Sequence, residues 1–499
     1  MSASKALTAL VASILSIGPT VAAAQTDYTE IPLVASDGQR RDQFAIAVAA
    51  TDDYVVVGAP GDDRFCCRTG SVYVFSRDDW MQLAQLQPLD PVLGQFFGFA
   101  VAASGDTILV GAYAAAPSGI YRGGAAYVFV RDSTGGWSQQ AKLVASAVSA
   151  SALFGYSVAL DGDTAVVGAY GDSNLSGAAY VFRRRNSVWT EEAKLTPSPP
   201  ASYADFGFSV AVEGDTAAIG APRAQFYPGG DAVYVFERSN GNWARTVRLV
   251  AADFVPFDGF GFSVDLSGNT LVVGAPYKDN NTGAAYAFVR SGTGWTQEAR
   301  LSAPGIRVGD YYGLEVGIHD DTVAVGAPIE GSDYGAVYVF GRAKTGWDAP
   351  LRLTPSDPLP DKFGLSLAVA ERAVVVGAYA WPGPGTPNEY TGKAYVYLRP
   401  PTASELAADL VAFVDTSIAD GTLVGIGPGA SARNRLRVVR HLIAAARDFI
   451  AKNKSAPACS HLMNAYRRVD GSAPDFAGGP AAAETRDRII ELRATLGCP

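Results

Sequence analysis

The sequence is poor in the side chains on which most enzyme chemistry depends. It has only three histidines among 499 residues, His319, His441 and His461, and none belongs to a His-Glu-x-x-His arrangement. That zinc-protease motif is therefore excluded. Ser157 and Ser209 follow a Gly-aromatic pair, but they lack the second glycine of a nucleophile elbow and recur from repeat to repeat. These observations favour a protein without a catalytic centre.

Cysteine is also scarce, with four in the chain. Cys459 and Cys498 lie near the C-terminus, and we expect them to pair, as cysteines do in an oxidising compartment. Cys66 and Cys67 are adjacent. They are interpreted as two thiols or one strained link in a loop, because two cysteines alone are too few to hold a metal.

Long apolar runs are missing as well. Residues 1–24 combine Lys5, an apolar stretch and three alanines at 22–24, which is typical of a secretory signal. That stretch is too short to cross a bilayer, and no later one is long enough. We therefore expect a mature chain that starts at Gln25, does not span a membrane, and is secreted or periplasmic.

Basic residues are in the minority, and the formal net charge is −9. The acidic excess lies in residues 1–399, whereas residues 400–499 are close to neutral. An acidic protein repels phosphate, so nucleic acid is not an expected partner.

Glycine, by contrast, is abundant, with 54 residues, and much of it belongs to a repeat. Residues 154–195 read FGYSVALDGDTAVVGAYGDSNLSGAAYVFRRRNSVWTEEAKL. Four short segments rich in β-branched, aromatic or alternating residues are separated by Gly, Asp, Asn and Ser, which predicts four antiparallel strands. Gly162-Asp163 joins the first two segments and suits a type II′ hairpin.

The unit recurs seven times at intervals of 51 to 57 residues. Its first marker lies at Phe44, Phe97, Phe154, Phe206, Phe260, Tyr312 and Phe363. Four strands at a fixed period of this size predict an all-β, seven-bladed β-propeller over residues 25–399.

The fourth strand of the unit opens with tryptophan in six repeats but not in the last, which runs into Pro400. Residues 28–34 (YTEIPLV) resemble the missing strand. We expect them to complete the seventh blade and leave no open edge in the ring.

These markers resemble the FG-GAP repeats of the integrin α-subunit and of secreted bacterial proteins. The resemblance covers residues 28–399 and implies a propeller used for extracellular binding and adhesion. Integrin-type blades often bind calcium between their first two strands. Here that connection is a two-residue hairpin such as Gly105-Asp106, which cannot supply six to eight oxygen ligands. The chain also has no Arg-Gly-Asp. We expect no metal and no cofactor.

Residues 400–499 predict a small all-α bundle. Thr402 and Glu405 form a capping box ahead of an apolar helical pattern. Further helices are predicted over residues 431–452, 458–469 and 481–496.

The longer loops, between second and third strands and between blades, must emerge on one face of a propeller. Exposed aromatic and basic residues on a rigid scaffold are binding candidates, although tolerated loop variation is the alternative. The candidate binding face comprises Tyr121, Arg122, Arg223, Tyr227, Tyr277, Trp381 and Tyr390. The aspartates that precede the FG pair are interpreted as turn residues bonded to local N–H groups.

The sequence thus favours a monomeric, non-enzymatic binding or adhesion scaffold for an unknown protein or glycan. The alternative is an extracellular, polysaccharide-active enzyme with its site over the central channel. A cluster of histidines and carboxylates on the loop face would favour the enzyme, and an aromatic face without one would favour binding.

Overall fold

The structure is a computed structural model that describes residues 28–39, 41–62, 68–147, 149–198, 203–223, 231–292, 294–357, 362–379, 392–425, 430–469 and 477–498. The chain divides into two units, Met1–Leu398 and Arg399–Pro499. The predicted signal segment, Cys66 and Cys67 lie outside the described residues.

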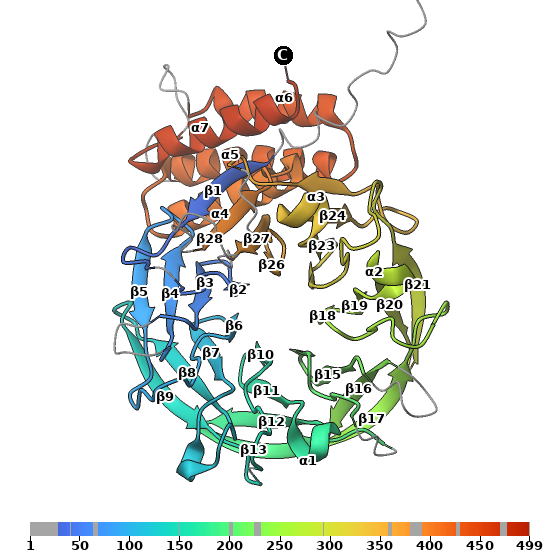
Figure 1. Cartoon of the computed structure of the whole chain (residues 1–499). Helices are drawn as coiled ribbons and strands as arrows, with labels where there is room; N and C mark the ends of the chain where they lie inside the picture. Colours follow the sequence, from blue (N-terminus) through green and yellow to red (C-terminus); the bar gives the residue numbers. More distant parts are fainter. Residues whose placement is uncertain are drawn as a thin grey trace, which may run out of the picture. The chain divides into compact units, whose positions relative to one another are not determined.

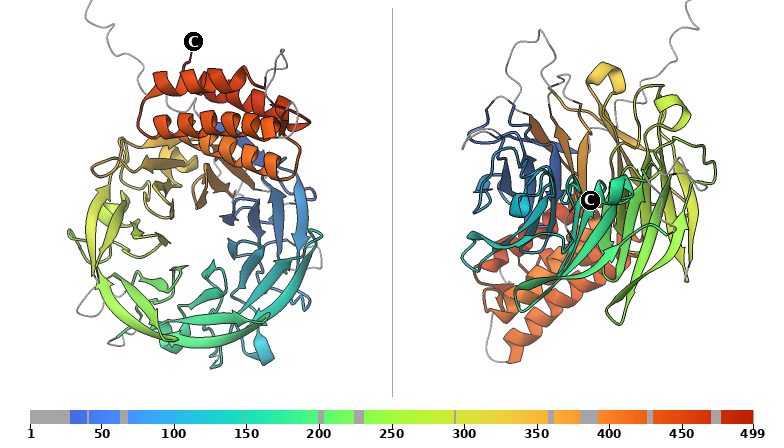
Figure 2. Two further views of the ribbon diagram at one scale, coloured as in Figure 1. Left: turned by 180° about the vertical axis from the view of Figure 1, so that it is seen from behind. Right: turned by 60° about the horizontal axis from the view of Figure 1, so that its bottom comes forward.

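The first unit is a ring of seven four-stranded sheets, so the predicted seven-bladed propeller is confirmed. Figure 1 shows the blades following one another around a central axis, and Figure 2 shows the same order from behind. The first three blades are β2 (Ala47–Ala50), β3 (Tyr54–Ala59), β4 (Ser71–Ser76) and β5 (Gln82–Leu86); β6 (Ala100–Ser104), β7 (Thr107–Ala112), β8 (Ala125–Arg131) and β9 (Trp137–Leu143); and β10 (Val158–Asp161), β11 (Thr164–Ala169), β12 (Ala178–Arg185) and β13 (Val188–Leu195).

The remaining blades complete the ring. They are β14 (Val210–Glu213), β15 (Thr216–Ala221), β16 (Ala232–Ser239) and β17 (Asn242–Leu249); β18 (Val264–Ser267), β19 (Thr270–Ala275), β20 (Ala284–Ser291) and β21 (Gly294–Leu301); β22 (Val316–His319), β23 (Thr322–Ala327), β24 (Ala336–Gly341) and β25 (Leu351–Leu353); and β26 (Ser366–Ala370), β27 (Ala373–Ala378), β28 (Lys393–Leu398) and β1 (Thr29–Leu33). One-turn helices lie between second and third strands: η2 (Pro117–Gly119), α1 (Asp172–Leu175), α2 (Lys278–Asn281) and α3 (Glu330–Asp333).

The N-terminal strand closes the ring. β1 pairs antiparallel with β28, from Thr29 opposite Leu398 to Leu33 opposite Ala394. The Glu30 carboxylate also accepts hydrogen bonds from the Ser356 backbone and hydroxyl, in the loop that leads from the preceding blade. The two ends of the propeller are therefore held in one sheet.

Local sequence explains the strand types. Six of the seven second strands, such as β11, are buried at every residue, and in β23 only Thr322 is half-buried, because neighbouring blades cover both of their faces. The first two strands meet in the expected two-residue hairpin, with Asp161 opposite Thr164 and a φ of +51° at Gly162.

Two details differ from the sequence prediction. The first strand of the third blade starts at Val158 rather than Phe154, because Gly155 adopts a φ of +88° and breaks the extended chain. The outer strands of the first and sixth blades, β5 and β25, begin after Trp80 and Trp347 and do not include them. Pro350, just before β25, has no N–H to donate to a sheet.

Neighbouring blades meet backbone to backbone through two glycines of each repeat. One is the glycine of the FG pair, and the other opens the Gly-Ala-Pro or Gly-Ala-Tyr sequence at the end of the second strand, which we call the GAP marker. A Cβ atom on Gly168 would lie 2.1 Å from the carbonyl oxygen of Gly207 in the next blade. The Ser157 hydroxyl donates to that same oxygen at 2.9 Å, and Ser209 makes the equivalent bond to Gly261 at 2.8 Å. The structural interpretation of these serines is confirmed.

Tryptophans that mark the outer edge of the blades also join neighbouring blades, in at least two cases through a side-chain hydrogen bond. The Nε1 of Trp189 donates to Gln140 at 2.8 Å, and that of Trp347 donates to Glu298 at 3.0 Å, in each case in the preceding blade. These indoles therefore contribute to packing between blades.

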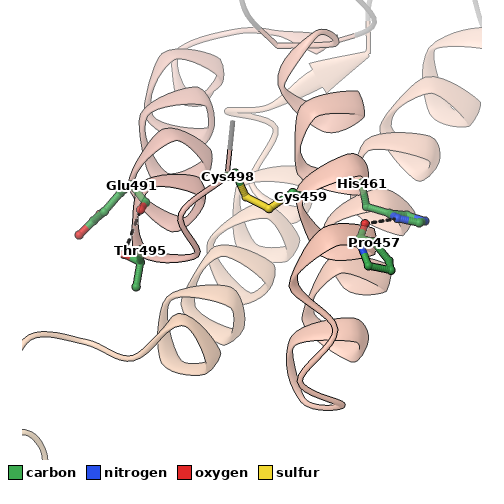
Figure 3. The surroundings of a disulfide bond; sticks show 6 residues. All are labelled: Pro457, Cys459, His461, Glu491, Thr495 and Cys498. Carbon is green, nitrogen blue, oxygen red and sulfur yellow. Dashed lines mark hydrogen bonds between the residues drawn. A yellow bond between two sulfur atoms is a disulfide. The ribbon is translucent and has the colours of Figure 1, made fainter.

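The second unit consists of α4 (Ala403–Ala419), α5 (Ala430–Ile450), α6 (Ser455–Tyr466) and α7 (Ala481–Thr495), with a short pair of strands, β29 (Val424–Gly425) and β30 (Ala477–Gly478). The predicted capping box at Thr402 and Glu405 is present. Cys459 on α6 and Cys498 after α7 form the predicted disulfide, with their Cα atoms 5.5 Å apart (Figure 3). In the part of the chain that the structure describes, no helix is long and apolar enough to cross a membrane.

Candidate functional site

The innermost strand of every blade borders the central channel. At the end where the first strands begin, the channel opens into a cavity of about 400 Å³. Its mouth is formed by the residue that follows the FG pair in each blade. These residues are Ile46, Phe99, Tyr156, Phe208, Phe262, Leu314 and Leu365. Because loops between second and third strands emerge at the same end, the cavity belongs to the loop face.

Aromatic side chains dominate the part of the mouth that belongs to the second to fifth blades. They continue outward through residues at the ends of the second strands and in the loops between blades. We call the whole set the aromatic rim: Phe96, Phe99, Tyr113, Tyr156, Tyr170, Phe208, Phe262, Tyr277 and Tyr311. All nine side chains are half-buried.

Ring contacts link the rim across blade boundaries. The Tyr156 ring lies 5.0 Å from Phe99 in the preceding blade and 5.1 Å from Phe208 in the following one, centroid to centroid. Tyr170 packs edge-on against Tyr156 at 4.6 Å. Such aromatic contacts favour fixed ring positions, so the rim presents a preorganised surface.

Two arginines of the predicted face flank this rim. The loop at Arg122 is held by a hydrogen bond from the Leu153 N–H to the Arg122 carbonyl, and Arg223 donates its own N–H to Ala204. The partners in these two hydrogen bonds, Leu153 and Ala204, lie a few residues before the rim residues Tyr156 and Phe208. Burial raises the pKa of the Tyr170 hydroxyl, while the positive charges of Arg223 and Arg122 oppose that rise.

Asp205 lies beneath one of these arginines. Its side chain is 2% exposed, and its Oδ2 lies 3.4 Å from the Nε of Arg223. Burial raises the pKa of Asp205 to about 6, against the lowering effect of Arg223. The equivalent Asp258 and Asp310 instead accept hydrogen bonds from local N–H groups, at 2.8 and 2.6 Å, which confirms the turn interpretation for those two.

Deeper in the channel, a second cavity of about 230 Å³ contains two carboxyl groups in its lining. Burial raises the pKa of Glu315 to about 8, and the charge of Asp265 adds to that rise. Burial likewise raises the pKa of Asp265 to about 6, although its oxygens accept N–H bonds from Leu266 and Ile318. Sequence reasoning had not selected either residue.

Four residues of the predicted binding face, Tyr121, Arg122, Arg223 and Tyr277, are among the described residues. Tyr121 is 65% exposed and its ring lies 5.4 Å from the Arg122 guanidinium. Tyr277 belongs to the rim, with its ring 5.7 Å from that of Phe262. Tyr227, Trp381 and Tyr390 lie outside the described residues.

Sequence reasoning missed the centre of the rim. Tyr113 and Tyr170 end the GAP marker and Tyr156 follows the FG pair, so all three belong to the repeat and none was selected as a binding candidate. The available signal was the clustering of aromatic residues at these marker positions in consecutive blades. Only the ring geometry shows that they meet.

The described residues contain no group of three or more His, Cys, Asp or Glu side chains arranged to hold a metal ion. Of the histidines, His319 ends β22 on the hairpin face, and His461 contacts the Pro457 carbonyl through Nδ1 at 2.9 Å (Figure 3).

Comparison with known proteins identifies one family. The model of the FG-GAP repeat matches six segments, at residues 29–75, 80–129, 137–182, 189–236, 243–288 and 295–340. No curated protein matches the chain.

Proposed function

The chain belongs to the FG-GAP repeat family, and on that basis we propose that it is a non-enzymatic binding or adhesion scaffold, exported from the cell. It acts as a monomer and takes a protein or glycan ligand on the loop face of its propeller. An FG-GAP propeller is compatible with such a role. The disulfide supports the export, because such bonds persist in oxidising compartments.

The aromatic rim is the observation that carries this proposal. Half-buried rings held by their neighbours offer a large contact area at low entropic cost, which is the property that makes aromatic residues binding hot spots. The rest of the propeller's buried aromatics, such as Phe154 and Tyr180, pack inside blades and have no such access.

A second candidate function is favoured by the carboxyl pair in the channel. Glu315, with a pKa raised to about 8 by burial, stays protonated at neutral pH and has the property required of a general acid. This supports the alternative of an extracellular, polysaccharide-active enzyme.

Array screening tests the first proposal. The native protein is applied to glycan and matrix-protein arrays, with and without divalent metal, beside Tyr156→Ala and the control Leu83→Ala, which truncates an exposed side chain on outer strand β5. We expect hits that Tyr156→Ala loses and Leu83→Ala keeps. Hits that survive Tyr156→Ala unchanged would place binding elsewhere.

The enzyme is tested separately by release of reducing ends from a panel of polysaccharides. Turnover by the native protein that is abolished in Glu315→Gln would replace the scaffold proposal with the alternative.

A further inference from the structure

Several third-strand tyrosines of the propeller donate their hydroxyls to carboxylates: Tyr180 to Asp172 at 2.7 Å, and Tyr286 to Asp253 at 2.8 Å. These hydroxyls are satisfied inside the blade. Tyr338 and Tyr395 follow the same pattern.

The rim tyrosines differ. The hydroxyls of Tyr113, Tyr156 and Tyr170 have no hydrogen-bond partner among the described residues. Burial raises the pKa of all three hydroxyls, so they remain protonated donors over the physiological pH range. Half-buried donors without a partner are costly unless water or a ligand accepts from them.

Two arginines act on these donors although the propeller as a whole is acidic, while the buried Asp205 carboxyl acts on Tyr156 and Tyr170 in the opposite sense. Arg122 comes from the second blade and Arg223 from the fourth, so they approach the rim of the third blade from both sides. Arg122 has no ion pair among the described residues, and its guanidinium rests on the Tyr121 ring. Arg223 is 62% exposed, and the carboxylate it faces, Asp205, is buried beneath it.

We propose that Tyr113, Tyr156 and Tyr170, between Arg122 and Arg223, form a binding site for an acidic saccharide of the uronate type. The flat C–H faces of a pyranose ring pack on aromatic rings, and its carboxylate accepts charge-assisted hydrogen bonds from guanidinium and phenol groups. Of these five residues, Tyr156 lines the cavity of about 400 Å³, whose volume lies within the range of small-ligand sites, about 300–1,000 Å³. The other four lie outside the cavity lining, on the adjoining loop face.

Other ligand classes use this surface less completely. A neutral saccharide leaves Arg122 without an anionic partner, and a cationic ligand is repelled by both arginines. An acidic peptide satisfies the charges but brings no rigid ring face to the tyrosines. The inference deepens the proposed function and rests on it.

Calorimetric titration of the full chain with a tetramer of galacturonic acid tests the ligand class. The matched control ligand is the same tetramer with its carboxyl groups methyl-esterified, which keeps the rings and removes the charge. We expect the acid to bind at least about tenfold more tightly than the ester, the effect of losing one charge-assisted contact. Equal binding of both, binding only of a hexaglutamate peptide, or no binding of the acid would overturn the proposal.

Three variants test the residues. Arg122→Gln should weaken binding of the tetramer about tenfold, and the double variant Tyr156→Phe with Tyr170→Phe, which keeps the rings, about fivefold or more. The control Arg185→Gln removes the same charge from the end of β12, on the hairpin face of the propeller, where the Arg185 side chain is 69% exposed. It should bind as the native protein does. Thermal melts identify any variant that fails to fold, and an unchanged affinity in folded Arg122→Gln would contradict the proposal.

The array experiment separates this inference from the proposed function. Array hits that depend on Tyr156 but include no acidic saccharide would sustain the scaffold and overturn the ligand assignment. Hits that all survive Tyr156→Ala would place binding away from the rim and overturn the ligand site, and an absence of any hit would overturn the scaffold itself.

Discussion

At the scale of single residues, the repeat is held by close backbone contacts that only glycine allows. The glycine of each GAP marker faces a carbonyl oxygen of the next blade, and in six blades that carbonyl belongs to the glycine of the FG pair. The first blade has Ala45 in place of that second glycine, with a φ of +69°. A left-handed backbone conformation is unfavourable for alanine, yet Ala45 adopts it. The close contact with the GAP glycine is therefore kept even where the second residue is not glycine.

The first prediction concerns this contact. In Gly220→Ala, the new Cβ would lie 2.1 Å from the Gly261 carbonyl oxygen, so the two blades must move apart. We expect a loss of about 2–3 kcal/mol in the free energy of unfolding, as for other overpacked sites. The control Gly294→Ala has its nearest atom at 3.9 Å and should change stability little. Denaturant unfolding of both variants measures the difference, and equal stabilities would refute the contact.

A second prediction concerns Asp231, whose side chain is buried. Burial raises its pKa to about 7, although its Oδ2 accepts the Gly259 N–H at 2.7 Å. Between pH 4 and 7 the folded state therefore holds a proton that the unfolded state has released, and the stability contributed by this group is lost as pH rises through that window.

Asp231→Asn cannot release this proton. The stability of the variant relative to the native protein should rise between pH 4 and 7, by the order of 3 kcal/mol, and then level off. Unfolding curves of both proteins at a series of pH values measure this difference, in which other titrating groups cancel. A difference that stays constant across the window would show that Asp231 ionises normally.

At the scale of elements, β1 is the strand on which ring closure depends. It pairs with β28 over five residues, and the next strand along the chain lies in a different blade. A chain that begins at residue 35 should expose the edge of β28 and melt at a lower temperature, with a tendency to associate through that edge. A chain that begins at Tyr28 is the control. Identical melting curves and monodisperse light scattering for both chains would contradict this role.

In the helical unit, the disulfide joins two cysteines that lie 39 residues apart in the sequence. Closing a loop of that length stabilises by roughly 3–4 kcal/mol in the chain-entropy model. Replacing both cysteines with serine should lower the stability of this unit and leave that of the propeller unchanged. Calorimetry resolves the two transitions, and an unchanged helical transition would show that the bond adds nothing.

The elements themselves were largely predictable because repetition multiplies weak local signals. The secondary structure of one segment such as residues 158–169 (VALDGDTAVVGA) is ambiguous when it is taken alone. Seven repeats of the same pattern, with turns at the same positions, indicate propeller blades. Strand boundaries were less predictable. The positive φ of Gly155 delays the start of β10, and Pro350, which has no N–H to donate, directly precedes the shortened β25. The short pair β29 and β30 had no sequence signal, since two residues per strand carry no period.

At the scale of the whole molecule, the proposed function rests on the features that differ from blade to blade. The mouth has aromatic residues in the second to fifth blades and aliphatic ones, such as Ile46 and Leu314, in the others. The sequence predicted the arginines beside this mouth from their loops. It did not predict the tyrosines, because residues some fifty positions apart meet only when the ring closes.

The most direct test of this account is hydroxyl-radical footprinting of the intact protein, with and without the ligand that the arrays rank first. Bound ligand should protect the peptides that contain Tyr156 and Tyr170 and leave Trp189 and Trp347, on the outer strand side, at their free reactivity. Protection confined to those tryptophans or to the helical unit, with the rim tyrosines unaffected, would contradict a ligand site on the loop face.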